Sequence, residues 1–308
     1  MDIESPHTGD PAPPGDQPAG EAIPRHHIGE YIRVVAVTLL VALCLKTFVV
    51  EAFRIPSGSM ENTLLIGDFL IVNKLAYGLR TPRYFPFTNV AMPVLTVPFH
   101  GRVRRGDVVV FEFPGSPDEI RPSESVNYVK RCVGLPGDTV TIVHGIVSVN
   151  GVQAMFPEHA RPALEYFLPR RYRRFRMYPP GSNFSELNYG PLAVPRVGDT
   201  LLLSPENIRS WRVFIEREGH TVSSGDSGAV ILDGQRTNRY VVQRNYYFMM
   251  GDNRGNSLDS RFWGFVPDDN IVGEALLIYW SWDPEKGAGG LLARFSSIRW
   301  GRIGNIIR

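Results

Sequence analysis

The chain has 308 residues, of which 43% are hydrophobic and 21% are charged, so the protein as a whole is not expected to be disordered. This length allows one large domain or two smaller ones. The net charge of +2 is too small to indicate nucleic acid binding, so no nucleic acid partner is expected. The two cysteines, Cys44 and Cys132, and the seven histidines show no metal-ligand spacing, and we expect neither a metal site nor a disulfide.

The N-terminal region combines a polar tail with an apolar segment. Residues 1–29 are rich in Pro, Gly, Asp and Glu, which predicts a disordered tail. Within residues 30–50, the run from Val34 to Val50 is apolar on all sides and is interrupted by Lys46 alone. A membrane-spanning helix needs about 20 such residues, so we predict a transmembrane helix over 30–50 in preference to a buried core helix. Basic residues flank both ends, and the charges therefore leave its orientation open.

After this helix the pattern changes to short strands. β-branched and aromatic runs are bounded by Gly, Asp and Pro, as at Phe69–Asn73, Asp107–Phe113 and Val126–Val133. Strand character returns at Arg239–Met250 and again at Ile271–Trp282, a segment too short for a second membrane span. The sequence therefore predicts a mainly β fold beyond the N-terminal helix.

Two basic stretches have alternative interpretations. The arginine-rich run at 170–176 either contacts anionic lipid head groups or forms a solvated face. The basic tail at 285–308 folds back either on the protein body or on the membrane. The charges alone do not decide between these alternatives.

A candidate nucleophile, Ser59, lies directly after the apolar segment. It belongs to the run from Ile55 to Met60, where a proline and a glycine favour a turn that exposes a hydroxyl. The competing interpretation is an ordinary Ser/Gly turn. A second serine motif, Gly225–Gly228, resembles the nucleophile loop of chymotrypsin-like proteases. It lacks a convincing His and Asp, so we do not expect it to be catalytic.

A serine nucleophile needs a base, and no histidine lies in a motif-like setting. A lysine can act as the base once burial has lowered its pKa. The chain has only four lysines, and Lys130 is the one inside an apolar strand, whereas Lys46, Lys74 and Lys286 lie at a membrane edge or beside turns. Lys130 is therefore either a buried neutral base or a half-exposed strand residue, and the residues alone leave both open.

Three separated segments resemble one known family. Phe53–Asn73, Tyr128–Asp138 and Gly251–Pro267 are similar, in this order, to the motifs of bacterial type I signal peptidases, also called leader peptidases. Members of that family are membrane-anchored serine/lysine endopeptidases. The similarity covers most of 30–150 and 240–283, while 151–240 matches only loosely. Asn62 departs from the pattern, because the family usually has proline there, and we expect this change to loosen the turn.

The resemblance implies a role for particular residues. Ser59 resembles the nucleophile and Lys130 the general base. Ser57 resembles the residue whose hydroxyl joins the Ser59 amide in an oxyanion hole. Further residues resemble those that support the site or line the shallow substrate pockets. The supporting residues are Ser257, which would orient the lysine, and the ion pair of Asp259 and Arg261, and the pocket residues are Phe53, Ile55, Leu70, Tyr128 and Val129.

The resemblance also implies an architecture and a location. An antiparallel β-sheet catalytic domain would be formed by 51–150 and 241–284, with a smaller β-rich domain inserted at 151–240. The amino terminus would be cytoplasmic and the catalytic domain would lie on the outer face of the bacterial inner membrane. The implied substrates are exported preproteins with small residues, typically alanine, one and three residues before the cut. No cofactor and no protein partner are expected. We expect membrane lipid to surround the transmembrane helix.

Two other functions remain open at this stage. A self-cleaving Ser/Lys protease, like the repressors of the DNA-damage response, would use the same chemistry, but the anchor helix and the lack of a DNA-binding helical domain argue against it. A membrane-tethered β-rich binding module would need no active site, although both Ser59 and Lys130 are present. Cleavage of a peptide with an Ala-x-Ala sequence would separate this module from an enzyme.

Overall fold

The computed structural model describes residues 26–81, 96–97, 101–155, 157, 176–225, 228–286 and 291–308. It divides into two units, residues 1–44 and 45–308, which are treated separately below. The predicted disordered tail falls outside the described residues up to position 25, and positions 26–29 of it are helical. The arginine-rich run also lies outside the described residues, apart from Arg176.

The N-terminal helix α1 spans His26–Phe48, so it begins four residues before the predicted start at 30 and ends two before the predicted end at 50. Its part from Ile28 to Phe48, 21 residues, is long and apolar enough to cross a membrane, and its side chains are exposed. Exposing apolar side chains on every side of a helix to water is energetically unfavourable, so α1 fits a membrane anchor.

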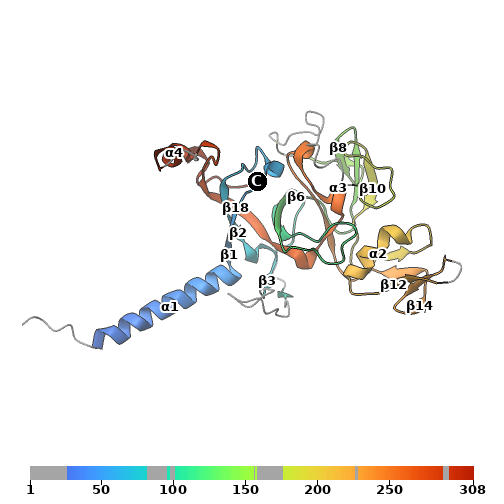
Figure 1. Cartoon of the computed structure of the whole chain (residues 1–308), viewed down its shortest axis with the longest axis horizontal. Helices are drawn as coiled ribbons and strands as arrows, with labels where there is room; N and C mark the ends of the chain where they lie inside the picture. Colours follow the sequence, from blue (N-terminus) through green and yellow to red (C-terminus); the bar gives the residue numbers. More distant parts are fainter. Residues whose placement is uncertain are drawn as a thin grey trace, which may run out of the picture. The chain divides into compact units, whose positions relative to one another are not determined.

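Among the described residues of the second unit, the sheet with the most strands has seven (Figure 1). All its neighbouring strands are antiparallel. In spatial order, the strands are β1 (Val50–Arg54), β2 (Asp68–Asn73), β18 (Ile271–Ser281), β5 (Val108–Glu112), β6 (Asn127–Gly134), β16 (Tyr246–Met250) and β17 (Val266–Pro267). The late strand β18 therefore lies between β2 and β5. The prediction of a mainly β, antiparallel fold after an apolar helix is confirmed.

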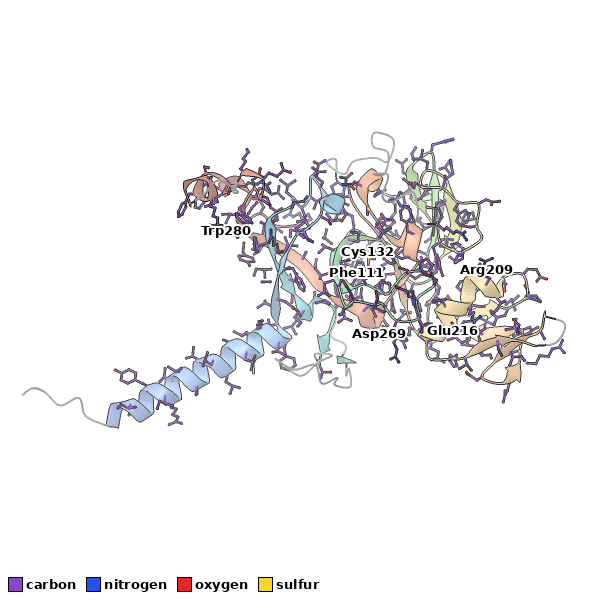
Figure 2. All side chains as sticks on the ribbon, in the orientation of Figure 1. Phe111, Cys132, Arg209, Glu216, Asp269 and Trp280 are labelled. Carbon is purple, nitrogen blue, oxygen red and sulfur yellow. The ribbon has the colours of Figure 1, made fainter. Side chains whose placement is uncertain are left out.

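Apolar side chains on both faces hold this sheet in place. One cluster includes the fully buried Phe111 of β5 and Cys132 of β6, which Figure 2 labels near the centre of the unit. A second cluster packs Leu70 of β2 against Val110 of β5 and Ile278 of β18. The sheet is rigid because it is buried on both sides, which makes it a suitable support for a site.

A smaller four-stranded sheet follows in the chain. Its spatial order is β10 (Tyr189–Ala193), β7 (Thr139–Val143), β8 (Ile146–Val149) and β9 (Val152–Gln153). This sheet crosses the boundary at residue 150 that we expected between the two domains, because β10 pairs with β7. The remaining elements of this region are α2 (Ile208–Arg217), β11 (Thr200–Leu202), β12 (Val222–Ser224), β13 (Val230–Leu232), β14 (Gln235–Arg236) and β15 (Arg239–Val241).

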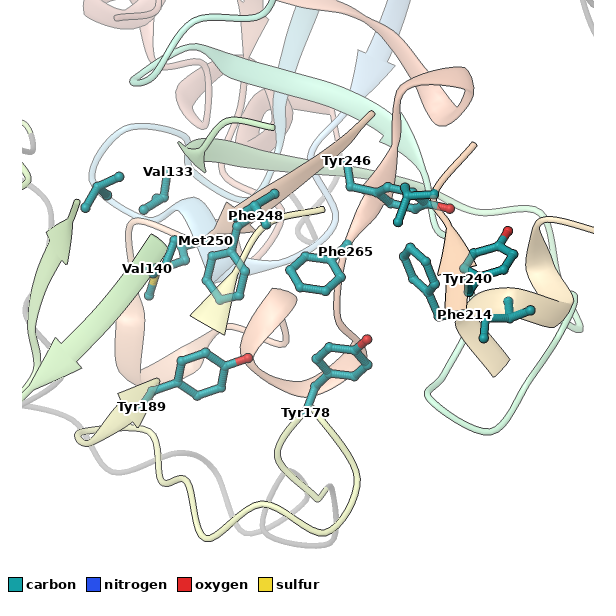
Figure 3. Packing of buried hydrophobic residues seen from close by; sticks show 14 of the residues in the cluster. Val133, Val140, Tyr178, Tyr189, Phe214, Tyr240, Tyr246, Phe248, Met250 and Phe265 are labelled. Atoms are coloured by element: carbon teal, nitrogen blue, oxygen red, sulfur yellow. The ribbon is translucent and has the colours of Figure 1, made fainter. Parts of the chain in front are cut away.

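An aromatic core joins this region to the large sheet. Tyr189 of β10 and Phe214 of α2 belong to one buried cluster with Tyr246 and Phe248 of β16 and with Phe265 (Figure 3). The ring centroids of Phe214 and Tyr246 are 4.6 Å apart. Because β16 contributes to both regions, the two share a hydrophobic core.

The basic tail packs on the protein body. Its elements are α4 (Leu291–Ser296) and a 3₁₀ turn, η8 (Trp300–Arg302). Single β-bridges join Ile298 to Trp282 and Ile306 to Leu277, and Arg302 forms an ion pair with the buried Asp68 at 2.6 Å. Of the two alternatives for this tail, the described residues therefore show contact with the body.

The short elements that remain connect the strands. They are the 3₁₀ turns η1 (Gly58–Met60), η2 (Lys74–Tyr77), η5 (Arg254–Asn256) and η6 (Asp268–Asn270), the short helix α3 (Ser260–Trp263), and the paired strands β3 (Leu79–Arg80) and β4 (Thr96–Val97).

Candidate active site

The turn that carries Ser59 follows β1 directly. The buried side chains of Ile55 and Met60 anchor the two ends of this turn in the core. Backbone hydrogen bonds from Ile55 N–H to Asp68 O (2.9 Å) and from Gly67 N–H to Ile55 O (3.0 Å) tie its start to β2. The Ser59 side chain is therefore held in place, with only 9% of the residue exposed.

Ser59 and Lys130 meet although they are far apart in the sequence. Lys130 Nζ lies 2.6 Å from Ser59 Oγ and 3.2 Å from the Val129 carbonyl oxygen. Only 4% of Lys130 is exposed, so the alternative of a half-exposed strand residue is wrong. Burial lowers the pKa of Lys130 from 10.5 to about 8, and the carboxylates of Asp259 and Asp252 partly oppose this shift. A lysine with this pKa is neutral often enough near neutral pH to take a proton from Ser59.

Ser57 lies two residues before the nucleophile. Its backbone is extended, with φ −137° and ψ 157°, and its side chain does not cap the turn that follows. Because Ser57 is exposed, its hydroxyl is free to turn toward a bound substrate.

Ser257 is fully buried behind the nucleophile. The hydrogen bond to Lys130 that the resemblance implied is not formed in this structure. The Ser257 side chain instead helps to lower the pKa of the neighbouring Asp259 carboxyl. Its hydroxyl also packs against the backbone of Gly251.

Gly251 touches both Ser257 and the nucleophile turn. A Cβ atom at this position would lie 2.2 Å from Ser257 Oγ and 2.5 Å from the Ser59 carbonyl oxygen, distances that Cβ atoms do not tolerate. Gly58 in the nucleophile turn faces no such restriction, since a Cβ there would meet Asn256 and Glu61 at 3.5 and 3.6 Å. Close backbone approach therefore requires glycine at position 251 and not at position 58.

We expect Gly251→Ala to lower the turnover of a cleavable peptide by about 10²-fold, because the added methyl group pushes the Ser59 backbone away and a shift of about 1 Å has this effect. The measurement is kcat on an Ala-x-Ala peptide. Gly301→Ala is the matched control, since a Cβ there meets no atom within 4 Å. Wild-type turnover in Gly251→Ala would contradict the tight contact.

Asp259 and Arg261 form a buried ion pair. Arg261 Nε and Nη2 donate to the two oxygens of Asp259 at 2.8 and 2.9 Å, and the Gly251 N–H donates to Asp259 Oδ2 at 3.2 Å. Burial alone would raise the pKa of Asp259, but the neighbouring guanidinium outweighs it, and the pKa of Asp259 is lowered. The carboxylate therefore stays charged and helps to keep the loop around Gly251 in place.

Arg131 and Asp252 form a second buried ion pair, which was not predicted from the sequence. Arg131 donates to both oxygens of Asp252, at 2.8 and 2.6 Å, and Thr63 Oγ1 donates to Asp252 Oδ2 at 2.5 Å. Arg131 follows Lys130 and Asp252 follows Gly251, so this pair links the strand of the base to the loop behind the nucleophile. An arginine inside an apolar strand was the signal that could have indicated it.

Asn253 was also missed, although it contacts the nucleophile turn directly. Its Nδ2 donates to the Gly58 carbonyl oxygen at 3.1 Å and to Glu61 Oε2 at 3.0 Å. Its backbone N–H donates to the Ser59 carbonyl oxygen at 3.1 Å. The loop from 251 to 253 therefore holds the turn through three hydrogen bonds.

Most of the predicted pocket residues come together. Ile55 and Leu70 are buried in one cluster with Met60, and the half-buried Phe53 and Val129 pack against it. Phe53 lies directly opposite Leu70 in the pairing of β1 with β2.

Tyr128, the fifth predicted pocket residue, packs in the neighbouring cluster instead. Its ring stacks on Phe113 with centroids 4.8 Å apart and lies 5.4 Å from Lys130 Nζ. It therefore borders the lysine.

Asn62 has an unusual backbone angle in the turn after Ser59, and the looser turn stays a prediction. Its φ is +79°, in the left-handed region that asparagine tolerates better than most residues. Proline cannot adopt this angle, because its ring fixes φ near −65°. The turn after the nucleophile is therefore built on a backbone that excludes the family's usual proline.

We expect Asn62→Pro to lower the free energy of unfolding by more than about 1 kcal/mol, since the ring forces the backbone out of its native angle. Thermal unfolding measures the effect. Asn62→Gly serves as the control, because glycine takes positive φ at no steric cost and should unfold at a higher temperature than the proline variant. A proline variant as stable as wild type would show that this turn adopts another conformation.

The described residues include no group of three or more His, Cys, Asp or Glu side chains placed to hold a metal ion. Both cysteines are free, with Cys132 buried and Cys44 exposed. In the Gly225–Gly228 motif, Asp226 and Ser227 lie outside the described residues. Among the described residues, Ser59 and Lys130 therefore remain the candidate catalytic pair.

A buried serine in contact with a lysine of lowered pKa, supported by an antiparallel β-sheet, is the arrangement that a serine hydrolase with a lysine base requires. Comparison with known proteins shows the family of the chain. The family model described as "Signal peptidase, peptidase S26" matches residues 28–280, and the chain belongs to this family.

Several relatives carry the name signal peptidase I. The one from Buchnera aphidicola (subsp. Schizaphis graminum) is 32% identical over 87% of this chain and 78% of its own length. The one from Pseudomonas fluorescens is 34% identical over 83% and 74%. A crystal structure of signal peptidase I from Enterococcus faecalis aligns with 56% of this chain and 96% of that one at 21% identity, with a TM-score of 0.25, too low to carry a structural argument.

Proposed function

We propose that this chain is a membrane-anchored endopeptidase that removes N-terminal signal peptides from exported preproteins and cuts after small residues of the Ala-x-Ala type. The observation that carries the proposal is the 2.6 Å contact between Ser59 Oγ and Lys130 Nζ in a buried setting. Membership of the signal peptidase family supplies the class of substrate. The self-cleaving repressor alternative has no support from these comparisons.

The first half of the reaction forms an acyl-enzyme. Neutral Lys130 takes the proton from Ser59 Oγ while this oxygen attacks the carbonyl carbon of the residue before the cut. The carbonyl oxygen becomes an oxyanion, which accepts hydrogen bonds from the Ser59 N–H and the Ser57 hydroxyl. The tetrahedral intermediate then expels the new amino terminus, which takes its proton from the Lys130 ammonium group.

The second half releases the signal peptide. Lys130, again neutral, takes a proton from a water molecule that attacks the acyl carbon. The Ser59 ester breaks, Ser59 Oγ regains its proton, and the signal peptide leaves with a carboxylate at its end. Asp259 and Arg261 keep the loop behind Ser59 in place, and Ser257 fills the space beside Gly251 without a bond to the lysine.

The substrate pockets are shallow and apolar in this proposal. Phe53, Ile55, Leu70 and Val129 line them, and Tyr128 borders the lysine. Support comes from the packing of the first four residues: Ile55 and Leu70 lie in one buried cluster with Met60, and Phe53 and Val129 pack against this cluster. A pocket that is shallow as well as apolar would accept only small side chains such as alanine.

For the location, we propose that α1 crosses the bacterial inner membrane once, with the amino terminus in the cytoplasm and the catalytic part on the outer face. Exported preproteins meet the enzyme on that face, and the membrane lipid is the surroundings of α1. We further propose that 51–150 and 241–284 provide the chemistry and that 151–240 has a supporting role. No nucleic acid, cofactor or additional protein is required.

The test is cleavage of a detergent-solubilised preprotein that carries an Ala-x-Ala site. The wild-type protein should cut it at one bond after the second alanine, and Ser59→Ala should not cut it at all. Ser223→Ala, which changes an exposed serine on β12, should cut as wild type does. No cleavage by the wild-type protein would favour the binding module, and cleavage by Ser59→Ala would remove Ser59 as nucleophile.

A further inference from the structure

We infer that Asn253 is a positioning residue that orients and polarises the peptide unit whose N–H stabilises the oxyanion. This inference rests on the proposed function, because it concerns the same reaction. Asn253 lies in the loop after β16, and only 3% of it is exposed. Its side-chain amide and its N–H donate to the turn that carries Ser59 and to Glu61, and its carbonyl oxygen accepts a hydrogen bond from the Asn256 N–H.

The peptide unit between Gly58 and Ser59 is the relevant group. It contains the Gly58 carbonyl and the Ser59 N–H. A peptide unit is planar and trans, so these two groups point in opposite directions. A donor that fixes the carbonyl oxygen on one side therefore fixes the direction of the N–H on the other side.

Two donors hold that carbonyl oxygen. Asn253 Nδ2 lies 3.1 Å from it, and the Glu61 N–H also donates to it at 3.1 Å. The Glu61 bond belongs to the turn itself and moves with it. The bond from Asn253 comes from a loop almost 200 positions further along the chain, so it positions the turn relative to the rest of the site.

The Ser59 N–H is available for a substrate. Ser59 lies in the first turn of the 3₁₀ element η1, and the early N–H groups of a helical turn have no partner inside it. Hydrogen bonds polarise one another along a chain, so donation to the Gly58 oxygen makes the Ser59 N–H a stronger donor. Both effects act when negative charge develops on the substrate oxygen and less in the ground state.

The chemistry of the asparagine amide suits this task. Its NH₂ group has two hydrogens, and the structure gives one to Gly58 O and one to Glu61 Oε2, at 3.1 and 3.0 Å. Its Oδ1 has no partner among the described residues. The Nδ2 hydrogens of Asn253, and not its Oδ1, therefore position the turn that carries Ser59.

The experiment compares Asn253→Ala with Asn270→Ala. Asn270 is a matched control, because its Nδ2 also donates to a backbone carbonyl, that of Glu112, at 2.9 Å, but away from Ser59. For Asn253→Ala we expect kcat on an Ala-x-Ala peptide to fall by about 10–100-fold, somewhat less than the loss of a direct oxyanion donor. The KM value and the apparent pKa of the rate profile should stay at wild-type values, because Lys130 is untouched.

A peptide aldehyde provides a readout that a merely structural residue would not move. Ser59 Oγ adds to the aldehyde carbon, and its proton passes to the former carbonyl oxygen, which gives a hemiacetal that resembles the tetrahedral intermediate. We expect the affinity of Asn253→Ala for an alanine aldehyde peptide to fall by the same factor as kcat. Its affinity for an uncleavable peptide with proline after the cut should not change.

Several outcomes would overturn the inference. They are a kcat equal to that of Asn270→Ala, a loss confined to KM, or an unchanged aldehyde affinity alongside a lower kcat. Should Asn253→Ala fail to fold, Asn253→Leu keeps the volume, removes both donors and gives the same test. Failure of the proposed function itself would be distinct, because the wild-type protein would then not cleave the peptide or Ser59→Ala would cleave it.

Discussion

Lys130→Ala is expected to lower kcat on an Ala-x-Ala peptide by up to about 10⁴-fold, the upper end of what a positioned general base contributes. The reason is that Lys130 Nζ is 2.6 Å from Ser59 Oγ, and the described residues place no histidine in contact with this oxygen. Lys74→Ala is the matched control, since Lys74 is a half-exposed lysine paired with Glu51 at 3.1 Å. Retention of a tenth of wild-type activity in Lys130→Ala would rule out a lysine base.

The dependence on pH gives this prediction a second measurement. Below pH 8 Lys130 is mostly protonated and has no lone pair to accept the serine proton. Because its pKa is about 8, wild-type kcat/KM should rise with pH and reach half of its plateau near that value. A rise centred near pH 6.5 instead would indicate a histidine.

The pH dependence of the free energy of unfolding should report the burial of Lys130 without any measurement of activity. Between pH 8 and 10.5 the unfolded chain binds a proton at Lys130 that the folded chain has lost, so wild-type stability gains with rising pH in this window. Below pH 8 both states hold the proton, and the folded state carries the full cost of a buried charge. Lys130→Met should therefore be more stable than wild type at pH 7, and the difference should shrink as the pH rises to 10.5.

Asp252→Ala is expected to lower the free energy of unfolding by about 3–5 kcal/mol, as breaking a buried ion pair does. Asp252 is fully buried and receives two hydrogen bonds from Arg131, so its removal leaves a buried guanidinium without its counter-charge. Denaturation by urea at neutral pH measures the loss.

The matched control for Asp252 is an ion pair on the surface. Arg212 and Glu216 pair at 3.0 Å on α2, with 59% of the Arg212 side chain exposed, and Arg212→Ala should lose only about 0.3–0.5 kcal/mol. Replacing both buried partners, as in Arg131→Met with Asp252→Leu, should recover much of the loss, since no charge is then left unpaired. A loss below 1 kcal/mol in Asp252→Ala alone would mean that Arg131 finds another partner.

The N-terminal helix and most strands of the large sheet could be predicted from local sequence patterns. The apolar run after the polar tail indicates the N-terminal helix, and the alternating segments indicate the strands, because these features depend on neighbouring residues. The scarcity of lysine singled out Lys130 as a candidate base. Its burial could not be decided from the sequence, because the exposure of a strand residue depends on what covers that face of the sheet.

Contacts between distant segments could not be predicted from local patterns. Asn253 reaches Gly58 and Asp252 reaches Arg131 only after the sheet has brought β1, β6 and the loop after β16 together. The pairing of β10 with β7 across the expected domain boundary has the same cause, since the hydrophobic alternation of a strand does not name its partner.

Backbone angles and exact side-chain contacts could also not be predicted from the sequence. The left-handed conformation of Asn62 depends on the turn as a whole, and the residue type only permits it. Whether Ser257 forms a hydrogen bond with Lys130 depends on interatomic distances, and a sequence pattern does not define these distances. Resemblance to a family indicates which residues belong to the site, and the structure determines which of them touch.

The central place of β18 bears on how the protein is made. Ser59 belongs to the piece formed by β1 and β2, and Lys130 to the piece formed by β5 and β6, and β18 is the strand that joins the two pieces in the sheet. During translation the earlier segments emerge first, and the contacts of 271–281 with both pieces are among the most non-local in the chain. A nascent chain that lacks β18 cannot hold serine and lysine together. We therefore expect the growing polypeptide to stay proteolytically silent until β18 has been synthesised.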